Sequence, residues 1–218
     1  MVVDAPQVAG EDVKALLIGV AGGIASGKTT VVDVFRNIGA TVISADQIGH
    51  EVLSEDHDVK HALVEAFGRE VLDADGWPDR SFLGSIVFNN PQAMNTLNSI
   101  VHPPLLSRMW AEVARAAEQP GTLAVVVDAA LIVDWSAQEQ FDILIVVTAP
   151  EPVRIQRLVA KGLTPEQARS RISAQLSDDQ RIAAADVVIR NDSSLADLRT
   201  DTERIWQKHV THDDLPDN

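Results

Sequence analysis

The sequence contains no cysteine among its 218 residues. Disulfide bonds, thiolate metal sites and thiol nucleophiles are therefore excluded, and the composition agrees with the reducing environment of the cytoplasm. The chain also lacks any apolar run close to the roughly 18 residues of a membrane-spanning helix, and residues 1–11 do not show the charged-then-apolar order of a signal peptide. We therefore expect a soluble, cytoplasmic protein with no membrane partner.

Positive charge is scarce as well. The chain has 18 Lys and Arg residues against 32 Asp and Glu residues, which gives a formal net charge of −14. No broad basic surface is available for a phosphodiester backbone, so we expect no nucleic acid partner. An anionic ligand must instead be held by a few placed cations. The hydrophobic content of 45% is enough for a full core, and the length favours one domain that carries an insertion.

A glycine-rich loop is the most informative segment that is present. Residues 22–29 read G-G-I-A-S-G-K-T and follow the pattern G-x-x-x-x-G-K-[ST], between an apolar run and a helical pattern. In such a loop the backbone N–H groups converge on phosphate oxygens, Lys28 reaches the β and γ phosphates, and the Thr29 hydroxyl is placed for Mg²⁺. A turn that binds no phosphate needs neither of these side chains. The residues predicted to hold a nucleoside triphosphate are Gly22, Gly23, Ile24, Ala25, Ser26, Gly27, Lys28, Thr29 and Thr30.

Five short apolar runs alternate with helical patterns along the chain. Their apolarity is continuous rather than alternating, which is typical of strands that helices cover on both faces. The sequence therefore predicts an α/β fold around a five-stranded parallel sheet. The five runs are residues 16–20, 41–44, 123–127, 143–148 and 186–189.

Residues 47–121, between the second and third runs, contain no convincing strand. A plain crossover needs a single helix, so this segment is predicted to be an inserted helical subdomain. By its resemblance to nucleotide kinases, where insertions after the second strand hold the acceptor, we expect it to bind the acceptor. We expect the last of its helices to be interrupted at His102-Pro103-Pro104, because proline breaks a helix. The expected pieces are helices at 59–67, at 80–88 and after Pro91, and a turn at 73–76.

A second helical region follows the fourth run. Residues 164–167, Thr-Pro-Glu-Gln, combine an N-cap, a proline at the first helical position and a glutamine that closes a capping box. The helix that they begin belongs to a lid expected over residues 154–180. The polar ends at 1–13 and 212–218 are expected to be disordered tails, which leaves a single domain over residues 14–211.

Two aspartates follow predicted strands, at the sheet edge where ligands bind in doubly wound folds. Asp46 comes directly after the second run and is a candidate base for an acceptor hydroxyl, but it also fits as the N-cap of a helix that begins at Gln47. Asp128 ends the third run, as in the Walker B pattern that orients Mg²⁺ or its water. Thr29 and Asp128 therefore form the predicted metal site.

Three cations, Arg154, Arg157 and Lys161, have helical spacing after the fourth run. One face of one helix would carry all three. In an acidic protein such a stripe suits ATP phosphates, because phosphoryl transfer relies on positive charge around the migrating group. A solvated helix face that pairs with neighbours such as Glu151 is the alternative.

Taken together, these motifs resemble the dephospho-coenzyme A kinase family over residues 16–198. The family's opening L-T-G-G-I-G-S-G-K-S-T corresponds to residues 19–30, and its V-I-D-A-D to residues 42–46. The loop is generic to many kinases, whereas three later motifs in their order are specific to this family. These are the His-Pro pair at His102-Pro103, R-I-x-A-Q at 171–175 and A-D-x-V-I-x-N at 185–191. Smaller matches are F-G at 67–68, D-G at 75–76, Arg80 and Phe88.

The resemblance implies ATP-dependent phosphorylation of the ribose 3′-hydroxyl of dephospho-coenzyme A, which gives coenzyme A and ADP. ATP and Mg²⁺ are the implied cofactors. The resemblance also implies that Arg80, His102 and Asp46 face the acceptor. From their sequence context alone, Arg80 and His102 could equally have a structural role. Asn191 joins the residues implied to bind the nucleotide. The implied catalytic residues are Asp46, Lys28, Arg154, Arg157 and Lys161.

The sequence departs from the family pattern at three places. The first aspartate of V-I-D-A-D is Ser44, and the usual P-L-L-F-E reads A-L-I-V-D at residues 130–134. The lid's Arg-Asp pair appears as Lys161-Gly162, with one residue missing. Lysine keeps the charge but loses the fork geometry of arginine, so the departures affect the lid contact rather than the reaction class.

Two other classes stay open. A shikimate or nucleoside-monophosphate kinase would share the loop and an aspartate after the second strand, but would not predict the His-Pro pair or the motif at 185–191. A GTP-dependent switch would fit the D-x-x-G at residues 46–49, yet the sequence has no N-K-x-D guanine motif.

Overall fold

The computed structural model describes residues 15–87 and 90–211. The two predicted tails and Phe88 lie outside the described residues. In the part that the structure describes, no helix is long and apolar enough to cross a membrane.

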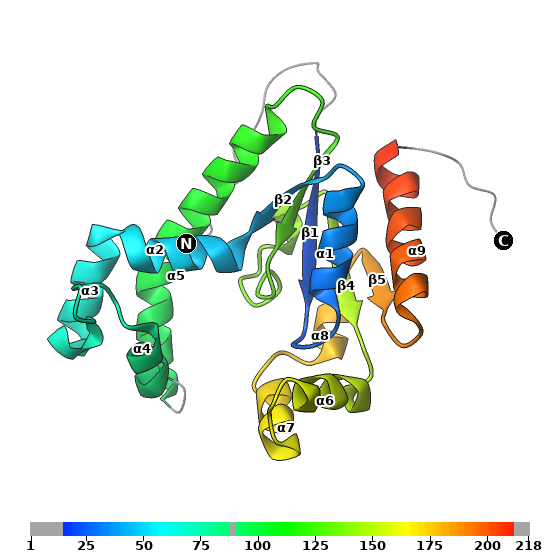
Figure 1. Cartoon of the computed structure of the whole chain (residues 1–218). Coiled ribbons are helices and arrows are strands. Elements are labelled where there is room, and N and C mark those ends of the chain that lie inside the picture. The colour runs from blue at the N-terminus through cyan, green and yellow to red at the C-terminus, as the bar shows by residue number, and fades with distance from the viewer. Residues whose placement is uncertain (1–14, 88–89, 212–218) are drawn as a thin grey trace. The chain divides into compact units, whose positions relative to one another are not determined.

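Contacts divide the described chain into two compact units (Figure 1). One unit comprises residues 44–112 and is built of helices. The other joins residues 15–43 to 113–211 and contains the sheet and the glycine-rich loop. The helical unit overlaps the insertion expected at 47–121, and its role in holding an acceptor stays a prediction.

The sheet has five strands in the order β2-β3-β1-β4-β5. β1 pairs in parallel with both β3 and β4, and β4 pairs in parallel with β5. The predicted five-stranded parallel sheet is therefore confirmed. The bounds are β1 Leu16–Gly22, β2 Thr41–Ser44, β3 Ala124–Asp128, β4 Ile143–Thr148 and β5 Val187–Arg190.

The core of the sheet-bearing unit lies between the sheet and two neighbouring helices, α1 (Lys28–Asn37) and α9 (Leu195–Trp206). The buried rings of Phe35 and Trp206 join these helices, with their centroids 6.3 Å apart. On the opposite face of β1, Gly19 lies against the side chains of Phe141 and Ile132. Both faces are covered, which explains why the strands read as continuous apolar runs.

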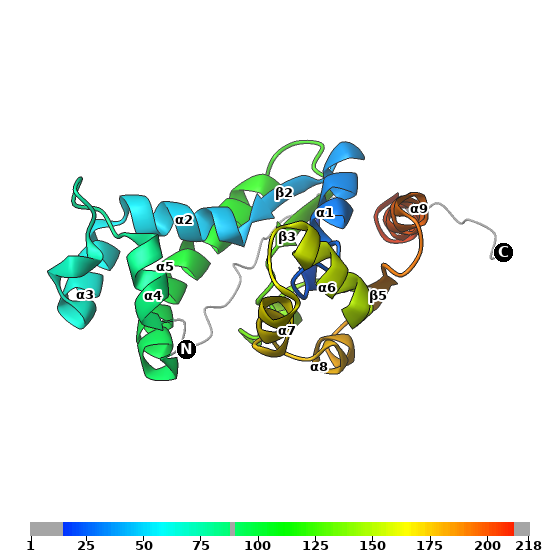
Figure 2. The ribbon, with the colours of Figure 1, turned by 60° about the horizontal axis from the view of Figure 1, so that its bottom comes forward.

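Three helices follow β4: α6 (Glu151–Ala160), α7 (Pro165–Ser173) and α8 (Asp178–Ala183). Figure 2 shows them in succession, with α6 and α7 packed against each other. The predicted capping box is confirmed, because the Thr164 hydroxyl accepts from the Gln167 N–H and the Gln167 side chain accepts from the Thr164 N–H. Short 3₁₀ and π turns complete this unit at Gln138–Gln140 and Gln207–Thr211.

The helical unit consists mainly of four helices. The predicted turn at 73–76 is present, and the Asp73 carboxylate accepts hydrogen bonds from the N–H groups of Asp75 and Trp77. The bounds are α2 Ala45–Glu55, α3 His57–Phe67, a 3₁₀ turn Arg69–Val71, α4 Arg80–Val87 and α5 Pro91–Ala117.

The expected interruption of the last helix is wrong, because α5 continues through Pro103 and Pro104. A proline in a helix interior costs about 3 kcal/mol through its missing N–H and the clash of its ring. Here Pro103 is exposed, while Val101 and Leu105 on either side of the pair are buried. Packing of the flanking turns therefore outweighs the local preference.

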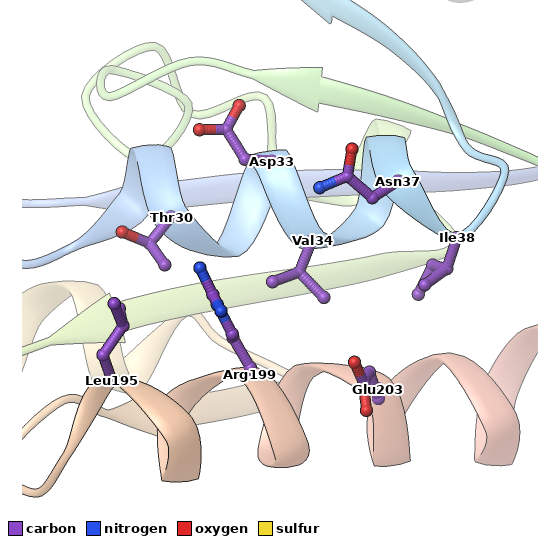
Figure 3. A pocket seen from close by; sticks show the side chains of 8 residues that line it. All are labelled: Thr30, Asp33, Val34, Asn37, Ile38, Leu195, Arg199 and Glu203. Carbon is purple, nitrogen blue, oxygen red and sulfur yellow. The ribbon is translucent and has the colours of Figure 1, made fainter.

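A groove separates the exposed sides of α1 and α9 (Figure 3). Apolar, polar and charged side chains line it (Figure 3). Its lining residues are Thr30, Asp33, Val34, Asn37, Ile38, Leu195, Arg199 and Glu203.

Candidate active site

Strand β1 delivers the chain directly into the glycine-rich loop, because Gly22 is its last residue and α1 begins at Lys28. Gly27 precedes the helix with φ 106°, a left-handed conformation that favours glycine. A Cβ at this position would also collide with the side-chain nitrogen of Asn191. The loop therefore ends in a helix N-terminus, as predicted for a phosphate site.

Two arginines of α6 hold the outer side of this loop. Arg154 Nε donates to the Ile24 carbonyl at 2.9 Å, and Arg157 Nη1 donates to the carbonyls of Ala25 and Ser26 at 3.0 and 3.2 Å. Arg154 is only 4% exposed. In a planar trans peptide the C=O and the next N–H point in opposite directions. The arginines therefore fix the peptides with those N–H groups directed away from α6.

Two side-chain amides complete the support. Asn191 follows β5, is buried, and donates from Nδ2 to the Ser26 carbonyl at 2.7 Å. Gln175, which follows α7, accepts from the Ile24 N–H through Oε1 at 2.8 Å. Both residues come from motifs that the sequence analysis quoted. The structure places them against the loop backbone, where they shape the loop.

Lys161 is not part of this arrangement. It comes directly after the last residue of α6 and its side chain is exposed, whereas Arg154 and Arg157 face the loop. Lys161 is the C-cap residue of α6, so the helix itself carries two of the three predicted cations. The approach of Lys161 to the nucleotide stays a prediction.

Lys28 and Asp128 form an ion pair at the base of the loop. Asp128 ends β3 and is in register with Val20 of β1, so parallel strands bring the two residues to one edge of the sheet. Their side chains are 14% and 18% exposed. Two separately predicted residues, the loop lysine and the Walker B aspartate, are therefore neighbours.

A cluster of three charged residues, the buried Arg154 and Arg181 with the partly exposed Asp178, was not predicted from the sequence. Asp178, the first residue of α8, contacts Arg154 Nη1 at 3.1 Å and Arg181 Nη1 at 3.5 Å. Arg181 is 1% exposed and donates to the Leu176 carbonyl at 2.6 Å. Burial lowers the pKa of Arg181, and the nearby carboxylates of Asp134 and Asp178 oppose that change.

The helical unit contains the predicted acceptor-side residues. The interpretation of Asp46 as an N-cap is wrong: α2 begins at Ala45, and Ser44 is the cap, with its hydroxyl accepting from the Gln47 N–H at 3.3 Å. Asp46 is instead exposed in the first turn of α2, where the helix dipole stabilises a negatively charged carboxylate. Ser44, the departure from the family's first aspartate, thus has a capping role of its own.

Arg80 and His102 belong to the same helical unit. Arg80 is the exposed first residue of α4, directly after Asp79, whose carboxylate accepts from the N–H groups of Ser81 and Phe82. His102 lies within α5, and burial lowers its pKa below the ordinary value for histidine. Their approach to a substrate stays a prediction.

Comparison with known proteins identifies the family. A family model described as dephospho-CoA kinase matches residues 16–197. The dephospho-CoA kinase of Frankia casuarinae is 39% identical over 193 residues, which cover 87% of this chain and 82% of that protein. The dephospho-CoA kinase of Corynebacterium efficiens is 39% identical over 197 residues, which cover 90% of this chain and 98% of that protein.

Solved structures agree with this result. A crystal structure from Thermus thermophilus has a TM-score of 0.75 and 26% identity, and covers 90% of this chain and 98% of that chain. The dephospho-CoA kinase of Campylobacter jejuni has a TM-score of 0.61 and 25% identity, and covers 89% of this chain and 97% of that chain. Shikimate kinase from Acinetobacter baumannii shares the fold at a TM-score of 0.50 and 16% identity. With a family model matched across both units and relatives aligned over most of its length, the chain belongs to the dephospho-CoA kinase family.

Proposed function

We propose that the chain transfers the γ-phosphate of ATP to the ribose 3′-hydroxyl of dephospho-CoA, giving CoA and ADP. The match of the dephospho-CoA kinase family model over residues 16–197 carries this proposal. The backbone cradle of residues 22–29, supported by Arg154, Arg157 and Asn191, is consistent with it. The small-molecule substrate, the absence of a nucleic acid or membrane partner and the cytoplasmic location proposed from the sequence fit the same reaction.

The loop and its cations supply electrostatic stabilisation in this mechanism. The loop N–H groups and Lys28 hold the β and γ phosphates, while Arg154 and Arg157 hold the loop carbonyls from the opposite side and add positive charge to the site from there. The arginines are already bonded to the loop backbone, and Lys28 already lies at its base beside Asp128. Little reorganisation is then needed at the moment of transfer.

Asp46 is the proposed base. A general base accepts the proton of the attacking hydroxyl and orients its lone pair toward phosphorus. Asp46 is exposed and does not cap its helix, so its carboxylate is available for this role. Arg80 and His102 are the proposed contacts to the acceptor.

The residues present fit a magnesium ion that arrives with ATP. Magnesium sites commonly use one or two carboxylates together with substrate phosphates and water. Asp128 offers a partly exposed carboxylate, which Lys28 already neutralises as a cation would, and the exposed Thr29 offers a hydroxyl. When bound, the ion would neutralise charge on the β and γ phosphates.

An acceptor panel tests the proposed function. Purified protein is incubated with ATP and Mg²⁺ plus dephospho-CoA, shikimate or a nucleoside monophosphate, and both ADP and the phosphorylated product are measured. We expect product with dephospho-CoA, and little activity when GTP replaces ATP. The Lys28→Ala variant, purified in parallel, controls for contaminating kinases. ADP release with shikimate or a nucleoside monophosphate, and none with dephospho-CoA, would overturn the proposal.

A further inference from the structure

Arg154 is held from two directions. Its Nε donates to the Ile24 carbonyl of the loop, and its Nη1 lies 3.1 and 3.3 Å from the two carboxylate oxygens of Asp178. Its Nη2 is buried and has no acceptor among the described residues. A Cβ on Gly23 would lie 2.6 Å from this Nη2, so the guanidinium is pressed against the loop.

The orphaned amino group carries a free-energy cost that the other hydrogen bonds of Arg154 must outweigh. A buried donor without an acceptor costs about 1–3 kcal/mol. An arginine free to rotate would relieve that cost by turning Nη2 toward water. The contacts of Nε and Nη1 therefore hold the guanidinium in place against this tendency.

Asp178 is well placed to impose that orientation. The preceding Ser177 caps α8 in a capping box with Gln180, which fixes the backbone of Asp178 independently of Arg154. Both oxygens of the Asp178 carboxylate accept from this one guanidinium nitrogen, a charge-assisted contact that restricts rotation of the planar guanidinium. The Arg154 guanidinium is thus held between α8 and the loop.

We propose that Asp178 is a positioning residue for the nucleotide loop. It orients Arg154 so that Nε holds the Ile24 carbonyl, and the loop then keeps the shape that receives the triphosphate. The inference rests on the proposed function, because it assumes that the loop binds ATP. It extends the site by a carboxylate that contacts no substrate and lies in the segment after α7.

The competing role for Asp178 is local neutralisation of Arg181. Arg181 is almost completely buried, and its Nη1 also lies near Asp178. If Asp178 served only this purpose, its loss would lower the free energy of unfolding but leave the loop and its nucleotide affinity unchanged. The two roles therefore differ in nucleotide binding measured on folded protein.

The test measures binding of a non-hydrolysable ATP analogue by calorimetry, without acceptor, together with kcat, KM for ATP and the melting temperature. We expect Asp178→Asn to weaken binding about tenfold, within the range of coupling energies for residues in one network. KM for ATP should rise by a similar factor, with a smaller change in kcat. Asp179→Asn is the matched control, because Asp179 is its exposed neighbour in the same first helical turn. It should stay within about twofold of wild type.

A double variant shows whether Asp178 acts through Arg154. Arg154→Gln should weaken analogue binding, and adding Asp178→Asn should then change it by less than about twofold, because the partner is already gone. Asp178→Glu retains the charge beside Arg181 but shifts the carboxylate by one methylene, and should lose about threefold in affinity. This variant decides the question if Asp178→Asn does not fold.

Three results would overturn the proposal. They are a lowered melting temperature of Asp178→Asn with wild-type analogue affinity, an equal loss of affinity on adding Asp178→Asn to Arg154→Gln, and wild-type affinity of Asp178→Glu. A wild-type protein that binds the analogue but does not phosphorylate dephospho-CoA would overturn the proposed function alone.

Discussion

Two hollows of the sheet-bearing unit are similar in size but opposite in character. The hollow between α6 and the segment 172–180 measures about 450 Å³ and contains Arg154, whose side chain is buried and bonded to the loop backbone. The groove between α1 and α9 in Figure 3 measures about 370 Å³ and contains Arg199, whose side chain is exposed. Size does not distinguish the two.

The comparison indicates that the proposed site is marked by an arginine held in place by hydrogen bonds, rather than by the presence of an arginine alone. Burying a guanidinium is costly unless carbonyls and carboxylates accept its hydrogen bonds. A buried arginine that contacts the glycine-rich loop therefore indicates that its position there has a function. An exposed arginine loses little on rotation and is screened by water and salt. We therefore expect the effect of a substitution on kcat and KM to decrease with the distance of the residue from the loop.

The largest effect should follow removal of the loop lysine. Lys28→Ala removes the ammonium group at the base of the loop and should lower kcat by about 10² to 10³. It should not unfold the protein, because no core volume is lost. Steady-state kinetics beside thermal unfolding without nucleotide is the check. A large fall in melting temperature would mean that the ion pair with Asp128 is structural.

Asp46 tests whether exposure alone makes a charged residue unimportant. Asp46→Asn should lower kcat about 10²-fold, at the lower end for loss of a general base, because the phosphoryl-transfer transition state is loose. Binding of dephospho-CoA should change only a few-fold. Ser44→Ala is the control, since it removes the true cap of α2 and should affect stability by about 1 kcal/mol instead. Turnover of Asp46→Asn at the wild-type rate with saturating substrates would place the base elsewhere.

A conservative change at Arg157 should have an intermediate effect. Arg157→Lys keeps the charge, but an ammonium group cannot reproduce the guanidinium bonds to the carbonyls of Ala25 and Ser26. We expect KM for ATP to rise about tenfold. If Arg157→Lys shows wild-type kinetics, a positive charge at position 157 is enough for ATP binding, and the guanidinium hydrogen bonds to the loop are not required.

The smallest effects belong to the exposed cations. Lys161→Ala and Arg199→Ala should each change kcat and KM for ATP by less than about twofold, because neither contacts the loop. Kinetics at low and at physiological salt measures this. A tenfold loss in Lys161→Ala would show that a cation beyond α6 reaches the nucleotide during turnover, as the family resemblance implies.

The loop, Asp128 and the parallel sheet could be predicted because local sequence determines them. Strand-ending residues of neighbouring parallel strands meet at one edge, so the contact between Lys28 and Asp128 follows from topology. The capping box at Thr164 depends on residues three positions apart and was equally accessible.

Longer-range features could not be found in this way. The link from Asp178 through Arg154 to Ile24 joins distant segments, and Asp178 by itself reads as an ordinary acidic residue at a helix start. The continuation of α5 through Pro103 and Pro104 depends on packing around the pair, which outweighs local preference. Ser44 could have been recognised as the cap, since serine precedes an acidic first turn.

Gly23 and Gly27 of the loop differ in which substitutions they can accept. Gly27 is constrained both by its left-handed backbone conformation and by the nearby Asn191 side chain. Replacing Asn191 would remove only the second constraint, so residues other than glycine would still be disfavoured at position 27. Gly23 has no such backbone constraint, and the three atoms nearest its hypothetical Cβ all belong to Arg154. We therefore expect alanine at position 23 to be better tolerated once residue 154 is shortened, an epistatic coupling between loop and helix that does not extend to Gly27.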